Sequence, residues 1–374
     1  MTDLSSAAGS DPLPAHLAAP PAPLSERRRA ALIAASKSLG PFVESDPEAL
    51  DRLEDPPTLA TPSELRIRIA SAYEAGGIGG LRAAKRRELL GIAARDLCGE
   101  ASVDDVGRAL SDLADACLDL LAAAVPGLGV VAMGKLGARE LNYYSDIDVI
   151  FVAEDVSESV RKGAEELLRE LGGAGAEGRA YIVDVDLRPE GRSGPLVRSL
   201  ESYLEYYRRW CEPWELQALI KARSAAGAVE VADALVAATR ELVFSVDVSA
   251  ERVAAIRKMK ERVEQNAMKV ARKSRTSESY DVKLGPGGIR DIEFAVQLLQ
   301  LVHGGSDPSV RSAATLDALP ALVDGGYVAD DDGAGLGVAY RWLRTVEHRL
   351  QLWQERRVRH LPRDEGEVTR LARV

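Results

Sequence analysis

An alternating run of apolar and acidic residues in the middle of the chain restricts the possible folds more than any other feature. The segment reads GKLGARELNYYSDIDVIFV (134–152), and its second half has the two-residue period of a β-strand. Ile147 and Val149 would face one side of such a strand. Asp146 and Asp148 would share the other side. The chain therefore needs a sheet that places two carboxylates next to apolar side chains.

Two carboxylates on one strand face repel each other unless a cation lies between them. At a separation of about 5 Å and an effective dielectric constant of about 20, the repulsion is roughly 3 kcal/mol. Mg²⁺ suits this position, because it prefers carboxylate oxygens and completes its shell with water and substrate phosphates. The alternative is an exposed edge strand with solvated acids, but the apolar run 149–152 favours a central strand. The sequence therefore predicts a magnesium site at Asp146 and Asp148.

Composition and charge exclude several classes of protein. The 374 residues suggest about two or three domains. Lys and Arg number 48 against 58 Asp and Glu, and this net charge of −10 argues against general nucleic-acid binding. The three cysteines form no CxxC motif, so neither a disulfide framework nor a zinc site is expected. No signal peptide and no apolar run of about 18 residues is present, so we expect a cytoplasmic protein with no membrane span.

The residue pattern divides the chain into a tail and three folded segments. Residues 1–25 are rich in Pro, Ala and Ser, which predicts a disordered tail. Apolar spacings of three and four predict an N-terminal helical region over 26–125, with turns at DPP and GGIGG. Strand and helix patterns alternate over 126–248, the expected catalytic domain. Helical patterns return over 249–374, and we expect a helical bundle there that the end of the chain interrupts.

Three strands and several helices are expected after residue 126. The strands are LGVVAMG (128–134), DIDVIFV (146–152) and RAYIVDVDLRP (179–189). The segment PWELQALIKARSAAG (213–227) has a helical pattern, and a long helix is expected over 249–273.

The glycine, the acid pair and the later acids follow one another in an order that is similar to the nucleotidyltransferase β-like superfamily. In such a site, two metal ions hold the attacking oxygen and the leaving phosphate of an in-line displacement. Gly134 would let the backbone approach the phosphates closely. Lys135 and Arg139 would neutralise charge in the transition state.

The residue pattern leaves the third acid of this site open. Asp184 and Asp186 share one face of the predicted third strand, so strand geometry does not choose between them. Arg188 shares that face as well. It would contact a phosphate or form a salt bridge with one of the two acids.

Four motifs in order resemble the glutamine synthetase adenylyltransferase/adenylyl-removing family of bacterial nitrogen control. They are GKLGARELNYYSDIDVIF, VDVDLRPEGRSGPLV, WELQALIKAR and KLGPGGIRDIEF, and the resemblance covers about residues 60–374. It implies an α+β fold, with a nucleotidyltransferase mixed sheet between an N-terminal helical region and a C-terminal helical bundle.

The resemblance also implies roles for individual residues. It makes Asp184 the third acid, so that the expected catalytic and Mg²⁺-binding residues are Asp146, Asp148 and Asp184. The expected nucleotide-binding residues are Gly134, Lys135, Arg139, Ser145 and Arg188. The acid at position 186 departs from the family pattern, and it would alter metal affinity or pair with Arg188.

Members of this family have two related halves, and the resemblance implies an activity for each. The first half removes AMP from a glutamine synthetase tyrosine by phosphorolysis, giving ADP. The second half adds AMP from ATP, and PII signal proteins and glutamine tune both activities. GGIRDIEF is similar to the first half, because an Arg follows its Ile. Deadenylylation is therefore expected here, and a second half is expected beyond VTRLARV (368–374).

Two rival functions stay open at this point. One is ATP-dependent adenylylation of the same target, and the other is a non-catalytic module that binds PII or glutamine synthetase. Two further motifs also carry alternatives. Glu215, Lys221 and Arg223 would bind nucleotide or line the cleft. The turn LGPGGIRD (284–291) would bind a phosphate through its amides or form a tight interdomain turn.

Overall fold

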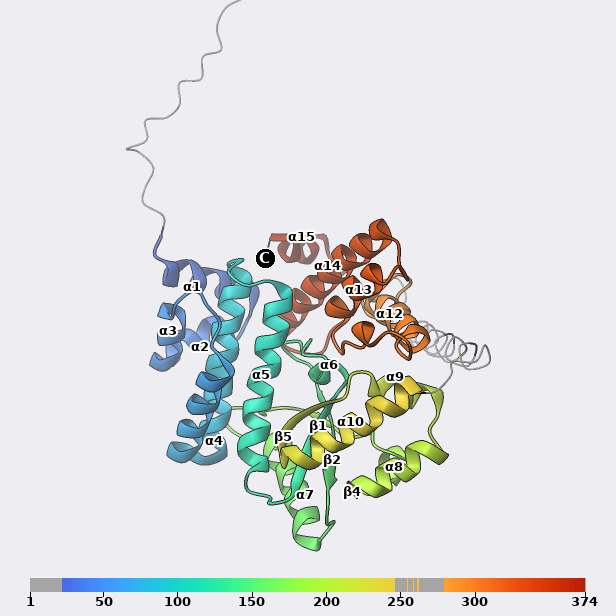
Figure 1. The fold of residues 1–374 in the computed structure, drawn as a ribbon. Helices are drawn as coiled ribbons and strands as arrows, with labels where there is room; N and C mark the ends of the chain where they lie inside the picture. The colour runs from blue at the N-terminus through green and yellow to red at the C-terminus, as the bar shows by residue number, and fades with distance from the viewer. Residues whose placement is uncertain (1–21, 246–253, 255–257, 259–260, 262–278, 374) are drawn as a thin grey trace, which may run out of the picture.

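The computed structural model describes residues 22–245, 254, 258, 261 and 279–373. The predicted tail lies outside these residues except for 22–25, and the predicted helix over 249–273 lies almost entirely outside them. Figure 1 shows helices α1–α5 on one side of a small sheet and helices α12–α15 on another. The fold is α+β, as the resemblance implied.

The N-terminal helical region is confirmed. Its helices are α1 (Leu24–Ala35), α2 (Leu39–Ser45), α3 (Pro47–Glu54), α4 (Pro62–Leu97) and α5 (Val103–Ala122). Thr61 and Ser102 begin α4 and α5 with capping boxes, which satisfy the free amides of the first turn. The GGIGG signal marks a kink in α4, where Gly77 has a φ of 58°.

The sheet is mixed and has five strands. They are β1 (Leu128–Met133), β2 (Ile147–Ala153), β3 (Val183–Asp184), β4 (Val197–Ser199) and β5 (Arg223–Gly227). The strand order is β3-β2-β1-β5, with β4 also paired to β2. β1 runs antiparallel to β2 and β5, whereas β3 and β4 run parallel to β2.

Both faces of β1 and β2 are buried, which explains why each strand is almost wholly apolar. Val149 and Phe151 pack in a core with the N-terminal helices and α7 (Glu158–Gly172). Ile150 and Val152 pack in a second core. That core includes α8 (Leu200–Arg209), α9 (Pro213–Leu219) and α10 (Val229–Ser245). The predicted central strand is therefore confirmed, and the edge-strand alternative is excluded for β2.

Two predictions about strands are wrong. The segment predicted as a third strand, 179–189, contains only the two-residue β3, because its second part turns. The Asp184 side chain accepts a hydrogen bond from the amide of Asp186, as in an Asx turn. The segment predicted as helix over 213–227 splits into α9 and β5. Pairing with β1 overrides the weak strand propensity of RSAAG.

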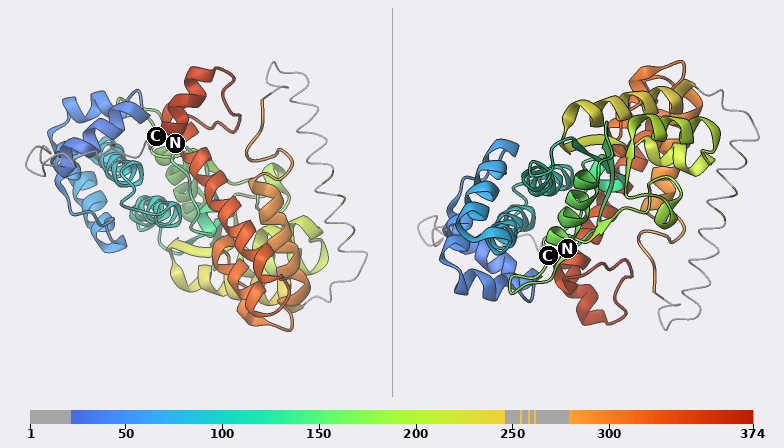
Figure 2. Two further views of the ribbon diagram at one scale, coloured as in Figure 1. Left: turned by 90° about the horizontal axis from the view of Figure 1, so that it is seen from above. Right: turned by 90° about the horizontal axis from the view of Figure 1, so that it is seen from below.

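The C-terminal helices pack beside the sheet and also contact the N-terminal helices α1 and α5 (Figure 2). They are α12 (Ile289–His303), α13 (Thr315–Asp324), α14 (Asp330–Gln354) and α15 (Glu365–Arg373). Short elements complete the described chain: α6 (Gly134–Gly137), η1 (Gly191–Ser193) and η2 (Pro308–Val310). None of the helices in the described part of the chain combines the length and the apolar character that a membrane span requires.

Candidate active site

Three aspartates meet at one end of the sheet. Asp146 directly precedes β2, Asp148 lies in it, and Asp184 is the register partner of Asp148 on the parallel strand β3. One carboxylate oxygen from each lies within 4.8 Å of the others. Asp186 does not belong to this cluster, so the geometry selects Asp184 as the third acid.

Asp148 is the acid whose electrostatic environment is most strained. Burial raises its pKa to about 7, and the charges of Asp146 and Asp184 add to this rise. The ammonium groups of Lys283 and Lys135 oppose the rise without cancelling it. Three hard oxygen ligands whose negative charge is only partly compensated match what Mg²⁺ binds, so the residues present fit this metal.

Gly134 makes room for the Asp148 carboxylate. A Cβ on Gly134 would lie 2.4 Å from Oδ2 of Asp148, which is far inside van der Waals contact. The residue also has a φ of 53°, a conformation that glycine adopts without strain. The sequence predicted that this glycine serves a phosphate, and the structure gives it a steric role toward the carboxylate site.

Lys135 lies beside this site, and an ion pair partly balances its positive charge. Its ammonium group is 3.0 Å from Oε1 of Glu347 on α14. Burial lowers the pKa of Lys135 to about 8, although Glu347 acts in the opposite direction. Burial alone would raise the pKa of Glu347, but Lys135 and Arg344 lower it to about 2. Lys135 therefore combines a lowered pKa with an ion pair to a carboxylate that stays negatively charged.

A cavity of about 710 Å³ opens beside Asp146. Its basic lining comes from Lys135, which follows β1, and otherwise from the C-terminal segments: Lys283, Arg356, Arg357, Arg359, His360 and Arg363. Among the described residues that line it, the acids are Asp146 and Glu347. The cavity is therefore strongly positive apart from its edge at the carboxylates.

Arg357 joins the C-terminal region directly to the carboxylate cluster. Its Nη1 donates a 2.6 Å hydrogen bond to Oδ2 of Asp146. The sequence reasoning missed this residue, together with Lys283 and Glu347. The basic run ERRVRH (355–360) could have indicated Arg357, but it lies more than 200 positions from the acid pair.

Two further predicted site residues lie near the cluster, but their contacts are local. The hydroxyl of Ser145 is 3.4 Å from Oδ1 of Asp146, and Ser145 lines the large cavity. Arg188 is buried and donates to the carbonyl oxygens of Val185 and Gly194, so it braces the loop after β3.

Asp186, the acid that departs from the family pattern, pairs with an exposed arginine. Nε of Arg192 lies 2.7 Å from Oδ2 of Asp186, whereas Arg188 is 3.9 Å from its Oδ1. Of the two roles that the sequence left open, the contacts favour ion pairing over metal binding.

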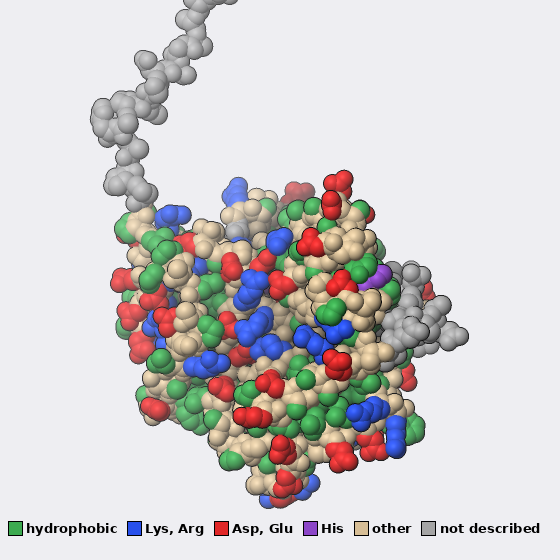
Figure 3. Space-filling model, in the orientation of Figure 1, with side chains coloured by type: hydrophobic (Ala, Val, Ile, Leu, Met, Phe, Trp, Pro, Cys, Tyr) green, Lys and Arg blue, Asp and Glu red, His purple; other side chains and the backbone are tan. Residues whose placement is uncertain are grey.

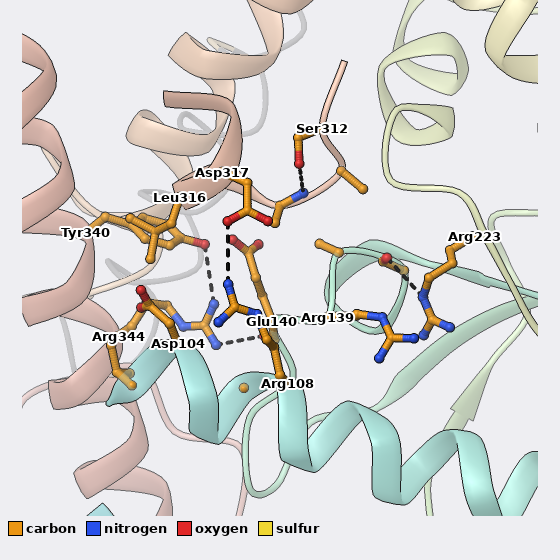
Figure 4. A pocket seen from close by; sticks show the side chains of 16 residues that line it. Asp104, Arg108, Arg139, Glu140, Arg223, Ser312, Leu316, Asp317, Tyr340 and Arg344 are labelled. Atoms are coloured by element: carbon orange, nitrogen blue, oxygen red, sulfur yellow. Dashed lines mark hydrogen bonds and ion pairs between the residues drawn. The ribbon is translucent and has the colours of Figure 1, made fainter. Parts of the chain in front are cut away.

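Arg139 lies in a different cavity. This second cavity, of about 200 Å³, is bounded by α5, the segment after α6, β5, and helices α13 and α14 (Figure 4). Arg139 has a φ of 55° and pairs with Asp112 of α5. Arg223 lines the same cavity and is 2.9 Å from Asp115. In the space-filling view, basic side chains gather along the middle of the face, at the level of α5 and α6 (Figure 3).

The remaining motif residues hold the fold together. Glu215 accepts a hydrogen bond from the amide of Glu212 in the capping box of α9. Lys221 is buried between Glu140 and Glu293, at 3.3 and 2.9 Å. The LGPGGIRD segment is a turn that leads into α12, which begins at Ile289 after Gly288.

Comparison with known proteins adds independent information. A family model described as glutamate-ammonia ligase adenylyltransferase matches residues 27–238. A second, described as PII-uridylyltransferase, matches residues 257–374.

Two relatives are both named bifunctional glutamine synthetase adenylyltransferase/adenylyl-removing enzyme. The one from Streptomyces avermitilis is 46% identical over 311 residues, covering 78% of this chain and 30% of the relative. The one from Mycobacterium avium is 41% identical over 373 residues, covering 92% and 36%. The chain thus spans about a third of the length of the curated relatives it matches.

Proposed function

We propose, because this chain belongs to the glutamate-ammonia ligase adenylyltransferase family, that it catalyses a Mg²⁺-dependent nucleotidyl transfer on glutamine synthetase. The observation that carries this proposal is the cluster of three aspartates at the edge of a large basic cavity. Acids that hold a cation and bases that hold phosphates are the two parts that phosphoryl transfer requires.

Each part of the site has a task in this proposal. Asp146, Asp148 and Asp184 would hold Mg²⁺. When bound, the metal would neutralise charge on the phosphate and align the attacking and leaving oxygens. Lys135, 3.0 Å from Glu347, would place a positive charge next to the same phosphate. Gly134 would keep the Asp148 carboxylate in position.

For the direction of transfer we propose deadenylylation. An oxygen of inorganic phosphate attacks the phosphorus of AMP–tyrosine, the bond to the tyrosine oxygen breaks, and that oxygen takes up a proton. The products are ADP and glutamine synthetase with an unmodified tyrosine side chain, so no side-chain nucleophile is needed. The resemblance of GGIRDIEF to the first half of such enzymes supports this direction.

The partners in this proposal are glutamine synthetase and the PII signal protein. The names of the relatives support the first, and the match of residues 257–374 to a PII-uridylyltransferase model supports the second. A cytoplasmic location and ATP or ADP as nucleotide belong to the same proposal.

A paired assay tests the direction of transfer. One reaction contains the 374-residue chain, Mg²⁺, phosphate and glutamine synthetase carrying radiolabelled AMP. The other contains the chain, Mg²⁺, labelled ATP and unmodified synthetase. Phosphate-dependent formation of labelled ADP in the first reaction is expected. Label transfer in the second reaction alone would establish adenylylation instead, and binding of synthetase without either reaction would indicate a non-catalytic module.

A further inference from the structure

We propose that the C-terminal region supplies a phosphate-binding wall to the active-site cavity, and that Lys283 and Arg357 are its principal anion ligands. The inference deepens the proposed function, on which it rests, by assigning the phosphate group to residues outside the catalytic domain. The sequence motifs and the family resemblance had placed phosphate contacts at Gly134, Lys135, Arg139, Ser145 and Arg188.

The charge of the cavity is the first observation. Two basic groups from 279–290 and 355–363 face the carboxylate cluster: Lys283 acts electrostatically on Asp148, and Arg357 contacts Asp146. Arg359 adds a third basic group, although its Nε is 2.9 Å from Oδ2 of Asp281. A phosphate group in this cavity would lie between the acids and the basic wall, where an acceptor-rich anion gains most.

The second observation concerns the surroundings of the Lys283 ammonium group. Among the described residues, no acid lies within ion-pair distance of its ammonium group, and the side chain is only partly exposed. Its loop is held in place, because Oδ1 of Asp281 accepts the amides of Lys283 and Leu284 at 3.0 and 2.9 Å. A positioned lysine without a carboxylate partner, at the wall of a cavity, is suited to bind an anion.

Arg357 is the third observation. It uses Nη1 to bond Asp146, and within the described part of the chain its other guanidinium nitrogens make no hydrogen bond. Its side chain is 56% exposed, so the guanidinium is accessible from the cavity. A guanidinium donates through two parallel N–H groups to a phosphate, which gives it a second partner beside the carboxylates.

The phosphate-binding wall explains why the sheet and the C-terminal segments contribute opposite charges to the cavity. Arg139 and Arg188, the other arginines expected to contact nucleotide, are engaged elsewhere. The carboxylates come from the sheet, and most of the cations that line the cavity come from the C-terminal segments. A phosphate site therefore forms only where these segments meet.

Calorimetric titration with inorganic phosphate, and separately with ADP, tests the proposal on the 374-residue chain with and without saturating Mg²⁺. Lys283→Gln and Arg357→Gln should each weaken phosphate binding by about tenfold, the value of one charge-assisted hydrogen bond. The matched control is Arg209→Gln, because Arg209 is exposed and pairs with Glu205 on α8, away from the cavity. It should bind phosphate as the unchanged chain does. Weakening for ADP but not for inorganic phosphate would overturn the inorganic phosphate site.

A second measurement separates this inference from the proposed function. Binding of Mn²⁺, followed by electron paramagnetic resonance, should be unchanged or tighter in Lys283→Gln, since the variant loses only a positive charge. Circular dichroism and the melting temperature show that each variant is folded. If a folded Lys283→Gln chain binds Mn²⁺ and phosphate as the unchanged chain does, the wall is overturned, while AMP release continues to test the proposed function on its own.

Discussion

At the scale of single residues, the site depends on holding three negative charges next to a buried strand. The negative charge is most unfavourable at Asp148, because burial, Asp146 and Asp184 all raise its pKa. Gly134 serves the same site sterically, because its lack of a Cβ leaves space for the Asp148 carboxylate. Neither arrangement improves folding, which is typical of residues kept for chemistry.

Asp148→Asn should stabilise the chain in the absence of divalent cations, and the gain should depend on pH. The pKa of Asp148 rises from an ordinary 3.8 to about 7 in the folded state. Between these values the folded chain holds a proton that the unfolded chain has lost, so stability falls as pH rises. The gain from the asparagine should be small near pH 4, grow up to about pH 7, and stay constant above.

Urea denaturation from pH 4 to pH 8 in chelator checks this expectation. The exposed Asp155→Asn is the control, and it should show no such trend. A gain in the free energy of unfolding from Asp148→Asn that does not change with pH would contradict the raised pKa of Asp148 as its cause.

Gly134→Ala should weaken divalent-cation binding by about tenfold or more, because displaced ligand geometry has effects of this size. The new Cβ would lie 2.4 Å from Oδ2 of Asp148 and must displace it. Mn²⁺ titration measures the loss. Gly335→Ala is the control, since a Cβ on Gly335 meets nothing within 4 Å in α14, and it should bind Mn²⁺ normally.

At the scale of elements, the GKLGARELNYYSDID segment serves as a docking surface as well as a site. Lys135 and Arg344 converge on Glu347, and Lys221 joins Glu140 of this segment to Glu293 of α12. These buried contacts hold α12 and α14 against the catalytic domain. Ion pairs, in addition to apolar packing, therefore fix the position of the basic wall relative to the carboxylates.

Lys221→Met should destabilise the chain by about 3–5 kcal/mol, because two buried carboxylates lose their ion-pair partner. Lys221 is 5% exposed, and the removed group contacts both Glu140 and Glu293. Lys162→Met is the matched control, since Lys162 is exposed and forms an ion pair with the likewise exposed Glu158. Chemical denaturation compares the two. Equal and small losses would show that the buried ion pairs do not hold the helices in place.

Elements with a clear local side-chain pattern could be predicted from the sequence. Prediction failed where contacts between segments far apart in the sequence determine the structure. β1 and β2 follow from apolar runs, and the acid pair follows from the strand period. β5 was missed because RSAAG becomes a strand only through pairing with β1. Arg357 and Lys283 were missed as site residues because only the packing of the C-terminal helices brings them to Asp146 and Asp148.

At the scale of the whole molecule, three regions meet around the segment between β1 and β2. The N-terminal helices cover one face of the sheet, α8–α10 cover the other, and the C-terminal helices close the end that carries the acids. The chain matches about a third of the length of its relatives, and this part by itself contains both the acid cluster and the basic cavity. We therefore expect the 374-residue chain to be active in isolation.

Release of labelled AMP as ADP from adenylylated glutamine synthetase, compared between the unchanged chain and Asp148→Asn, tests the central claim most directly. The unchanged chain should release label only with both Mg²⁺ and phosphate present. The folded Asp148→Asn variant should lose more than about 100-fold of this rate, since a metal ligand matters at least as much as the groups that orient it. An Asp148→Asn chain that releases AMP at the unchanged rate would contradict the assignment of the three aspartates as the active site.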